Sequence, residues 1–278
     1  MHRRAEIIYQ PLQHDKLEEL LVSSNIQFKD SGNIRKFFLN VDAASSVPII
    51  KEAVFQKATI LYSWQFDPRE LENAEWFLME SRCGKIDSAD DTYTFAYSCV
   101  KGVDVFGVEH YHHKRQIAPY CLRRTVKWNN KHNIYSDTNG GTHTFFCSSV
   151  AKEAFEQQLG GIEFVPVLSV KDKCPISDVY QICVLHHLPS EAVILPKGVT
   201  FEKCPYCGEK RIYFEHAGLD YIFLKKGFLD KGIDIYETED LFGWGFGYPL
   251  VVISRKMYLL LTETLRERTL HFTPISAL

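Results

Sequence analysis

The stretch that decides the fold is Phe145–Val167, FFCSSVAKEAFEQQLGGIEFVPV, because the chain repeats its pattern in Val251–Ile275, VVISRKMYLLLTETLRERTLHFTPI. In each stretch an apolar run ends at a serine, which is Ser148 in the first copy and Ser254 in the second. A serine hydroxyl at the start of a helix accepts a hydrogen bond from a free backbone amide. Both serines are therefore predicted to be helix N-caps.

Apolar residues recur at helical spacing after each serine, and each copy then ends on a strand-like stretch with the pattern Phe-x-Pro-Val/Ile. The matched helix positions are Ala151, Ala154, Phe155 and Leu159 in one copy and Met257, Leu260, Leu261 and Leu265 in the other. We interpret this as a strand–helix–strand unit that occurs twice, at about residues 143–169 and 249–276. Chance similarity between two αβ stretches is the alternative interpretation.

The repeated pattern resembles the C-terminal part of the bacterial double-CXXCG proteins and of related immunity-type proteins found beside polymorphic toxins. That group carries a CxxCG turn before the pattern, and here Cys204-Pro205-Tyr206-Cys207-Gly208 precedes the second copy. It also carries an upstream ELExAE helix, which Glu70–Glu75 matches. The resemblance covers residues 66–84 and, in pieces, 140–278. This chain departs from the family name by having one CxxCG turn instead of two.

The resemblance implies an α+β fold and a non-enzymatic role. Proteins of this type are expected to neutralise a cognate toxin by protein–protein contact. A fold-level analogy does not by itself establish function, so the chemistry of the individual residues is weighed separately.

Length and composition are those of an ordinary globular protein. The 278 residues are enough for one large or two modest domains, and 45% of them are hydrophobic. Aromatic residues make up 13% of the chain, which favours β structure. The net charge of −3 gives no general attraction to nucleic acid or to anionic membranes, so we expect neither as a partner.

Targeting signals are not evident in the sequence. Residues 1–21 contain two arginines but lack the uninterrupted apolar core of a signal peptide. No stretch approaches the roughly 18–20 apolar residues that span a bilayer. The eight cysteines are too sparse and irregular for a disulfide scaffold. We therefore expect a reduced, cytoplasmic protein.

The residue pattern changes near residue 88, where we place a domain boundary. The predicted N-terminal αβ domain, residues 1–88, closes with a helix that starts at the capping box Asp67–Glu70 and runs to Cys83-Gly84. The predicted second domain, residues 89–278, is rich in β structure. It begins with a β-meander and contains both repeats and the CxxCG turn.

Cys204 and Cys207 allow three interpretations. A redox dithiol needs a helix after its first cysteine, but Gly208 and the residues that follow predict a turn and a strand, paired as a hairpin with Tyr221–Lys225. A structural zinc would take both thiols plus two more ligands. The upstream candidates for those ligands, Cys83, Cys174, Cys183 and His186, lack knuckle spacing. The favoured interpretation is that Cys204 and Cys207 are free thiols, so no cofactor is predicted. If zinc does bind, these two cysteines are its expected ligands.

No complete catalytic constellation is found. A nucleobase deaminase would need a proline directly before CxxC, and Lys203 stands there instead. Cys147 and Ser148 lie at a strand-to-helix junction after His143, but the glycines of a nucleophile elbow are missing. We expect Ser148 to act as a cap and the protein not to be an enzyme.

Residues 109–132 are basic and contain interleaved aromatics. The cations are Lys114, Arg115, Arg123, Arg124, Lys127 and Lys131, with Tyr111, Tyr120 and Trp128 among them. Such a tract can hold phosphates and stack bases, and strand alternation places His110 and His112 on one face, where they could bind a metal. The alternative function is therefore a nucleic-acid-binding or metal-dependent module. A solvated sheet face is the simpler explanation.

The run from Gly243 to Pro249 lacks the Lys and Ser/Thr of a phosphate loop. Trp244, Phe246 and Tyr248 could contact a partner protein, since aromatics are enriched at interface hot spots. Inward packing at a tight bend is the alternative.

Together these observations predict an α+β fold with two strand–helix–strand repeats, and a non-enzymatic binding protein.

Overall fold

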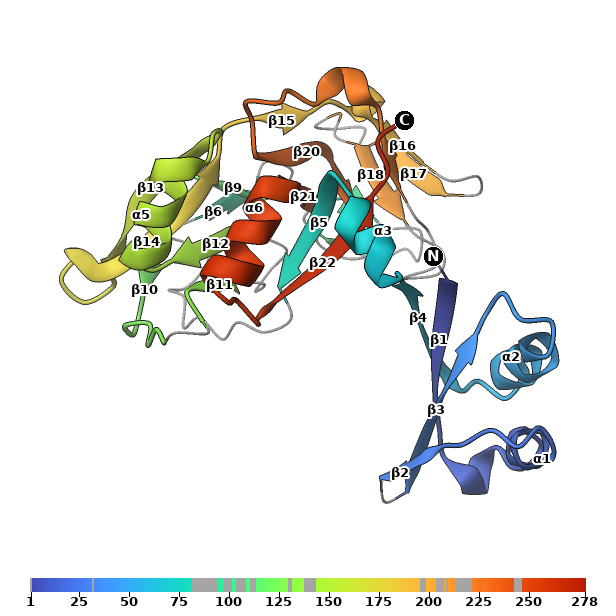
Figure 1. The fold of residues 1–278 in the computed structure, drawn as a ribbon. Helices are drawn as coiled ribbons and strands as arrows, with labels where there is room; N and C mark the ends of the chain where they lie inside the picture. The colour runs from blue at the N-terminus through green and yellow to red at the C-terminus, as the bar shows by residue number, and fades with distance from the viewer. Residues whose placement is uncertain are drawn as a thin grey trace. The chain divides into compact units, whose positions relative to one another are not determined.

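The computed structural model describes residues 2–31, 33–81, 95–97, 102–103, 109–110, 114–129, 132–137, 144–195, 199–203, 208, 210–213, 222–242 and 247–278. The chain forms two compact units (Figure 1). Met1–Asn73 form the first unit, and Ala74–Tyr213 together with Ile222–Leu278 form the second.

The described part of the first unit is a four-stranded antiparallel sheet with three α-helices and one 3-10 helix. Its elements are β1 (His2–Tyr9), η1 (Pro11–Gln13), α1 (Asp15–Ser23), β2 (Lys29–Ser31), β3 (Ile34–Asn40), α2 (Ser46–Phe55), β4 (Thr59–Gln65) and α3 (Pro68–Asn73). The sheet order β2-β3-β1-β4 with this chain order is the split βαβ arrangement of ferredoxin-like domains.

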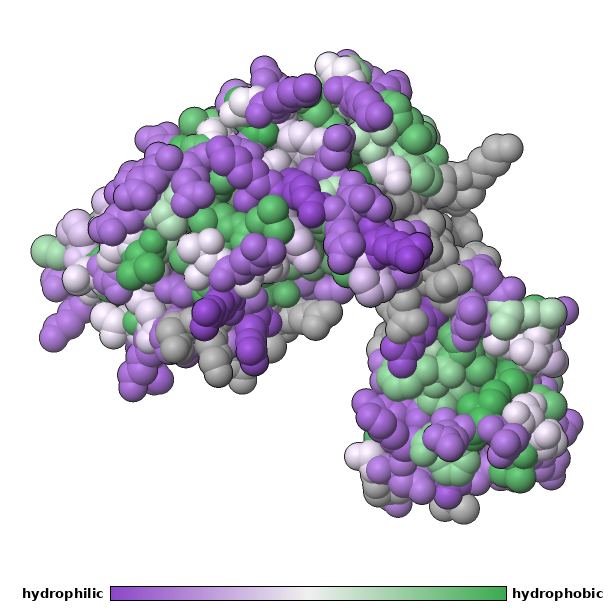
Figure 2. All heavy atoms as spheres, in the orientation of Figure 1, coloured by the Kyte–Doolittle hydropathy of each residue, from purple (hydrophilic) through white to green (hydrophobic). Residues whose placement is uncertain are grey.

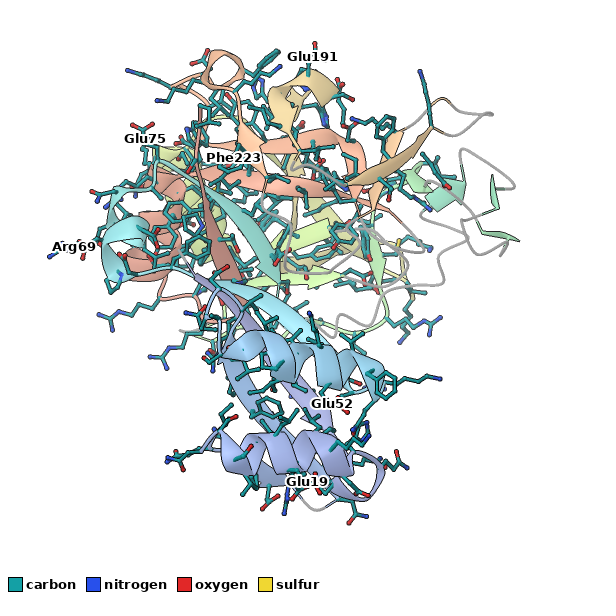
Figure 3. All side chains as sticks on the ribbon, turned by 90° about the vertical axis from the view of Figure 1, so that its right-hand side faces the viewer. Glu19, Glu52, Arg69, Glu75, Glu191 and Phe223 are labelled. Carbon is teal, nitrogen blue, oxygen red and sulfur yellow. The ribbon has the colours of Figure 1, made fainter. Side chains whose placement is uncertain are left out.

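Helices α1 and α2 lie side by side across one face of this sheet (Figure 3). Leu17 and Leu21 of α1 and Ile49 of α2 are buried against Ile7 and Phe37, which point to the same face of their strands. The period of 3.6 in the helices and of 2 in the strands brings these residues into one core. Apolar periodicity alone therefore accounts for this unit.

Helix α3 begins as predicted and ends earlier than predicted. The capping box is formed: the Asp67 amide donates to Glu70 Oε2 and the Glu70 amide donates to Asp67 Oδ1, each at 2.9 Å. The predicted continuation to Cys83-Gly84 was wrong, because Trp76–Ser81 forms strand β5 of the second unit. The first unit therefore ends at Asn73, whereas the sequence predicted a domain boundary near residue 88.

The second unit contains two lobes, each built on its own sheet. The first lobe has the sheet β10-β13-β14-β12-β11 and helix α5. The second lobe has the sheet β17-β18-β20-β21-β5-β22, with β15 paired to β20, and helix α6, which continues as the π-helix η5.

The elements of the first lobe are β10 (Cys121–Leu122), β11 (Ile134–Asp137), β12 (Thr144–Cys147), α5 (Ser149–Gln158), β13 (Ile162–Ser169) and β14 (Pro175–Val184). Those of the second lobe, besides β5, are β15 (His187–Leu188), β17 (Thr200–Lys203), β18 (Lys210–Tyr213), β20 (Ile235–Phe242), β21 (Tyr248–Ser254), α6 (Arg255–Leu259), η5 (Leu260–Thr264) and β22 (Leu270–Ile275). Shorter elements complete the unit: β6 (Phe95–Tyr97), β7 (Gly102–Val103), β8 (Glu109–His110), β9 (Lys114–Gln116), η3 (Ser190–Ala192), β16 (Val193–Ile194), β19 (Phe223–Leu224) and η4 (Lys226–Phe228).

The predicted α+β fold and the two strand–helix–strand repeats are confirmed. The Ser148 hydroxyl accepts a hydrogen bond from the Ala151 amide at 3.3 Å, and the Ser254 hydroxyl accepts one from the Met257 amide at 3.2 Å. The second copy is two residues longer than the first, and the difference lies in the loop after the helix, which is 159–161 in the first copy and 265–269 in the second. Both serines are therefore the N-caps that the sequence predicted.

The repeat extends further upstream than the sequence analysis recognised. In each lobe a strand pairs with the strand before the helix, so that Ile134 lies opposite Cys147 and Ile235 lies opposite Ile253. The preceding residue accepts a hydrogen bond from the capping serine: Ser148 donates to Asn133 Oδ1 at 3.0 Å, and Ser254 donates to Asp234 Oδ1 at 2.5 Å. The matching triplets Asn133-Ile134-Tyr135 and Asp234-Ile235-Tyr236 are the sequence signal that was missed.

The central strand of each lobe comes from outside that lobe's repeat. In the first lobe β14, which follows the repeat, lies between β12 and β13. In the second lobe β5, which precedes both repeats, lies in the equivalent place between β21 and β22. The register agrees as well, because Tyr180 faces Pro166 in one lobe and Phe77 faces Pro274 in the other.

The lobes contact each other reciprocally at the ends of their repeats. The loop after α5 reaches the cap of α6: the Gly160 amide donates to Asp234 Oδ2 at 3.0 Å, and the Asp234 amide donates to the Gly160 carbonyl at 3.1 Å. The loop after η5 reaches the cap of α5, where Glu267 Oε2 accepts from the Asn133 amide at 2.6 Å. The loop after the helix of each repeat thus contacts the helix cap of the other repeat, which is the arrangement of a pseudo-twofold pair.

Two predicted strand pairings were wrong. Strand β18 pairs with β17 and β20, while Phe223-Leu224 pairs with β16, so the hairpin of Ile212–Glu215 with Tyr221–Lys225 is not formed in the described residues. Within the predicted meander the described pairs are nested, β7 with β8 and β6 with β9. Short strands carry too little pattern to fix a partner.

None of the described helices is long and apolar enough to cross a membrane.

Candidate functional site

The CxxCG turn joins the two strands of a hairpin. Strand β17 ends at Lys203, which pairs with Lys210 at the start of β18, so Cys204 and Cys207 belong to the connection between them. Both cysteines lie outside the described residues. Among the side chains that the structure describes, no group of three or more His, Cys, Asp or Glu residues is placed to hold a metal ion.

The strand after the cysteine pair bears on the redox interpretation. Gly208 has a φ of +76°, a left-handed conformation that suits glycine, and β18 begins at Lys210. A thiol activated by a helix dipole requires a helix N-terminus, and the residues after this pair enter a strand instead. The strand at Lys210–Tyr213 therefore weighs against a redox dithiol, while the cysteine turn itself lies outside the described residues.

Cys147 and Ser148 are structural residues. The Cys147 side chain is fully buried, and burial raises the pKa of its thiol far above the usual value, so the thiolate nucleophile does not form near neutral pH. Ser148 is also buried, and its hydroxyl is used for the cap and for the hydrogen bond to Asn133. His143 lies outside the described residues.

The basic tract does not offer its described aromatics for stacking. Tyr120 is buried in the core of the first lobe and donates to Asp137. Trp128 donates from Nε1 to the Asp178 carbonyl at 2.6 Å and stacks on Tyr135 at 5.2 Å between ring centroids. The exposed cations there are Arg123, Arg124 and Lys127. Tyr111, His112, His113 and Lys131 lie outside the described residues, and of His110, Lys114 and Arg115 only the strand positions are described.

The Gly-aromatic run is described at one end only. Tyr248 opens β21 opposite Phe242, and burial raises the pKa of its hydroxyl above the usual value. Trp244 and Phe246 lie outside the described residues. Tyr248 is therefore half-buried between neighbouring strands rather than fully presented to solvent.

An exposed aromatic that the sequence analysis did not single out lies beside the cysteine turn. Phe201 is 59% exposed, and its strand β17 forms the edge of the second lobe's sheet. Of the described residues, only those of β18 pair with β17. Figure 2 shows hydrophobic groups on the surface over β16 and β17. The available signal was a lone phenylalanine between polar residues, Thr200-Phe201-Glu202-Lys203.

Cations flank Phe201 on the same face of the hairpin. Because residues two apart share a strand face, Lys203 and its partner Lys210 lie on the side of Phe201. The Lys210 ammonium is 5.1 Å from the Phe201 ring centroid. We call the surface formed by Phe201, Lys203 and Lys210 the β17 edge.

A buried carboxylate holds Lys210 in place. The Lys210 ammonium lies 3.0 Å from Asp240 Oδ2, and the Asp240 side chain is 3% exposed. Ser190 donates to the other oxygen of Asp240. Strand β20 is irregular between Glu237 and Leu241, and this irregularity includes Asp240. The β17 edge is therefore a fixed surface with a positioned cation next to an exposed ring.

Comparison of the chain with models of protein families, with curated proteins and with solved structures finds no match. The resemblance to double-CXXCG and immunity-type proteins stays a prediction, and the residues themselves carry the argument for function.

Proposed function

We propose that this chain is a non-enzymatic binding protein that acts by protein–protein contact through the β17 edge. The observation that carries the proposal is the 59% exposed side chain of Phe201 on the edge strand of the sheet. Large aromatics that become fully desolvated on binding dominate interface energies. Among the described residues only β18 pairs with β17, and an extended segment of a partner can add to the edge of a sheet.

The flanking charges support the same proposal. Lys203 gives the β17 edge an exposed positive charge within a chain whose net charge is −3, while the charge of Lys210 is balanced by Asp240. Fixed charges around an apolar centre favour partners of complementary charge and speed their association. A partner with an acidic rim around an apolar pocket fits this arrangement.

The resemblance stated above suggests a specific form of the proposal. In that form the chain is a cytoplasmic immunity protein, and its partner is a cognate bacterial toxin that it neutralises by contact. Nucleic-acid binding by residues 109–132 is the weaker alternative, because Tyr120 and Trp128 are engaged in packing.

The test is capture of partner proteins from the native host by the full chain and two variants. Phe201→Ala should weaken binding of a captured partner by roughly thirtyfold or more, as expected for a hot-spot aromatic. Phe228→Ala is the matched control, since Phe228 is 37% exposed on η4 in the same unit. Equal binding by wild type and Phe201→Ala, or no discrete partner, would contradict the proposal.

A further inference from the structure

Strands β10 and β13 bring two basic segments of the chain together at one corner of the first lobe. The strands are parallel, with Leu122 opposite Ser169, so the chain leaves both in the same direction. The Val170 amide donates to the Leu122 carbonyl at 2.9 Å, which continues the contact beyond the paired residues. All four cations that follow the two strands are exposed, and we call the surface they form the β10–β13 corner: Arg123, Arg124, Lys171 and Lys173.

The loop after β13 holds its two lysines on a hydrogen-bonded turn. The Lys173 amide donates to the Ser169 carbonyl at 3.0 Å, and the Ser169 amide donates to the Cys174 carbonyl at 2.8 Å. The Lys171 amide donates to Ser169 Oγ at 3.2 Å. The Lys173 ammonium lies 4.0 Å from Cys121 Sγ of β10, so its side chain reaches toward the other segment. The fold therefore positions these charges before any ligand binds, which lowers the ordering cost of binding.

Acidic residues offset little of this charge. Asp172 is the one acid in residues 121–128 and 169–175, and its Oδ1 accepts from the Cys174 amide at 3.2 Å. Within the part of the chain that the structure describes, no carboxylate lies at ion-pair distance from Arg123, Lys171 or Lys173. The β10–β13 corner is therefore a locally positive surface on a chain whose net charge is −3.

The chemistry of the corner fits phosphates better than a protein surface. No large apolar side chain in residues 121–128 and 169–175, all of which are described, is among the exposed ones. Such side chains are the anchors that dominate the energy of protein interfaces. Tyr120 and Trp128 are engaged in packing, so they do not stack bases. Arginine and lysine bind phosphate oxygens, which leaves the phosphate backbone as the part of a nucleic acid that this corner can contact.

We propose that the β10–β13 corner binds duplex nucleic acid through its phosphate backbone, independently of base sequence. Phosphates follow one another every ~1.7 Å along the axis of a duplex, so neighbouring cations can contact different phosphates. Binding then releases counterions, and the logarithm of the affinity falls with the logarithm of the salt concentration by about 0.9 per phosphate neutralised. Four cations predict a slope of roughly −3 to −4. This corner belongs to the first lobe, whereas the β17 edge belongs to the second.

Fluorescence anisotropy of a labelled DNA duplex with the full chain, between about 20 and 200 mM salt, tests the proposal. The double variant Arg123→Gln/Lys171→Gln should bind about tenfold or more weakly at the lowest salt, and its slope should be shallower by about 2 because two phosphate contacts are lost. Lys226→Gln/Lys231→Gln is the matched control, since it removes two charges at exposed positions of the same unit outside the corner. The control should keep the wild-type slope.

Competition by polyglutamate separates a phosphate partner from an acidic protein. Polyglutamate carries its charges farther apart than a duplex, so it should displace the labelled duplex about tenfold less well than unlabelled duplex does. Equal displacement would assign the corner to an acidic protein surface and overturn the proposal. Absence of duplex binding at the lowest salt, or equal slopes for the wild type and Arg123→Gln/Lys171→Gln, would also overturn it. The wild-type measurements decide the matter even if a variant fails to fold.

Discussion

Glu267 is a fully buried carboxylate that connects the two lobes through hydrogen bonds. Its Oε2 accepts from the Asn133 and Ile134 amides at 2.6 and 3.1 Å. Its Oε1 accepts from the Thr269 hydroxyl at 2.8 Å and from the Arg268 amide at 3.1 Å. These donors satisfy a charge that would otherwise be costly to bury, and those at Asn133 and Ile134 belong to the first lobe.

Replacing this carboxylate should strongly destabilise the second unit. In Glu267→Gln the side-chain NH₂ would face backbone donors, and the free energy of unfolding should fall by about 2–4 kcal/mol. Chemical denaturation followed by circular dichroism measures the change. Glu263→Gln, at an exposed position on η5, should stay within about 0.5 kcal/mol of the wild type. A similar loss in both variants would mean that the donors around Glu267 are not responsible.

At the scale of single residues, sequence patterns identified local hydrogen bonds and missed distant ones. Ser148 and Ser254 each bond an amide three residues away, so their role is readable from the adjacent apolar pattern. Glu267 bonds an amide 134 positions away, and no local rule predicts that contact. Phe201 was missed for the same reason, since its exposure depends on which strand lies at the edge.

At the scale of elements, α5 and α6 show how one pattern produces two helices with different surroundings. Lys152 and Tyr258 occupy equivalent positions, four residues after the capping serines. The Lys152 ammonium lies 5.2 Å from the Tyr180 ring centroid, and the Tyr258 ring stacks on Phe77 at 4.1 Å. The helix axis is thus placed alike over the central strand, while the contact differs in chemistry.

The shared cap geometry gives a paired prediction. Ser148→Ala and Ser254→Ala should each lower the free energy of unfolding by about 1 kcal/mol, because each removes the acceptor for a helix N-terminal amide. Thermal denaturation of the two variants provides the comparison. Ser276→Ala, on the exposed residue after β22, should have no measurable effect. A loss in one cap variant only would show that the two helix starts are not equivalent.

Element boundaries were least predictable where one residue set suits two structures. Leu71, Ala74, Phe77 and Leu78 have helical spacing, yet the helix ends at Asn73 and Trp76–Ser81 pairs with β21 and β22. Burial between two neighbouring strands outweighs the helical pattern here, because β5 places Phe77 and Met79 in the core, and helix propensity is a weak preference that tertiary packing overrides.

At the scale of the whole molecule, the second unit is two similar lobes, and the central strand of the second lobe comes from a part of the chain that precedes the first lobe. Strand β5 precedes the first repeat and completes the second lobe, while β14 follows the first repeat and completes the first lobe. The sequence reveals both repeats but not which lobe each central strand joins, because strands of similar composition can fit either place. The placement of β5 in the second lobe and the reciprocal cap contacts predict that the lobes unfold together.

Native-state hydrogen exchange on Val179→Ala tests that claim most directly. Val179 is 1% exposed in the core of the first lobe, and its truncation should cost about 2 kcal/mol. If the lobes form one cooperative structure, the slowest-exchanging amides of β5 and β21 in the second lobe should lose as much protection as those of β12 and β14. Loss confined to the first lobe, with β5 and β21 unchanged, would contradict the account.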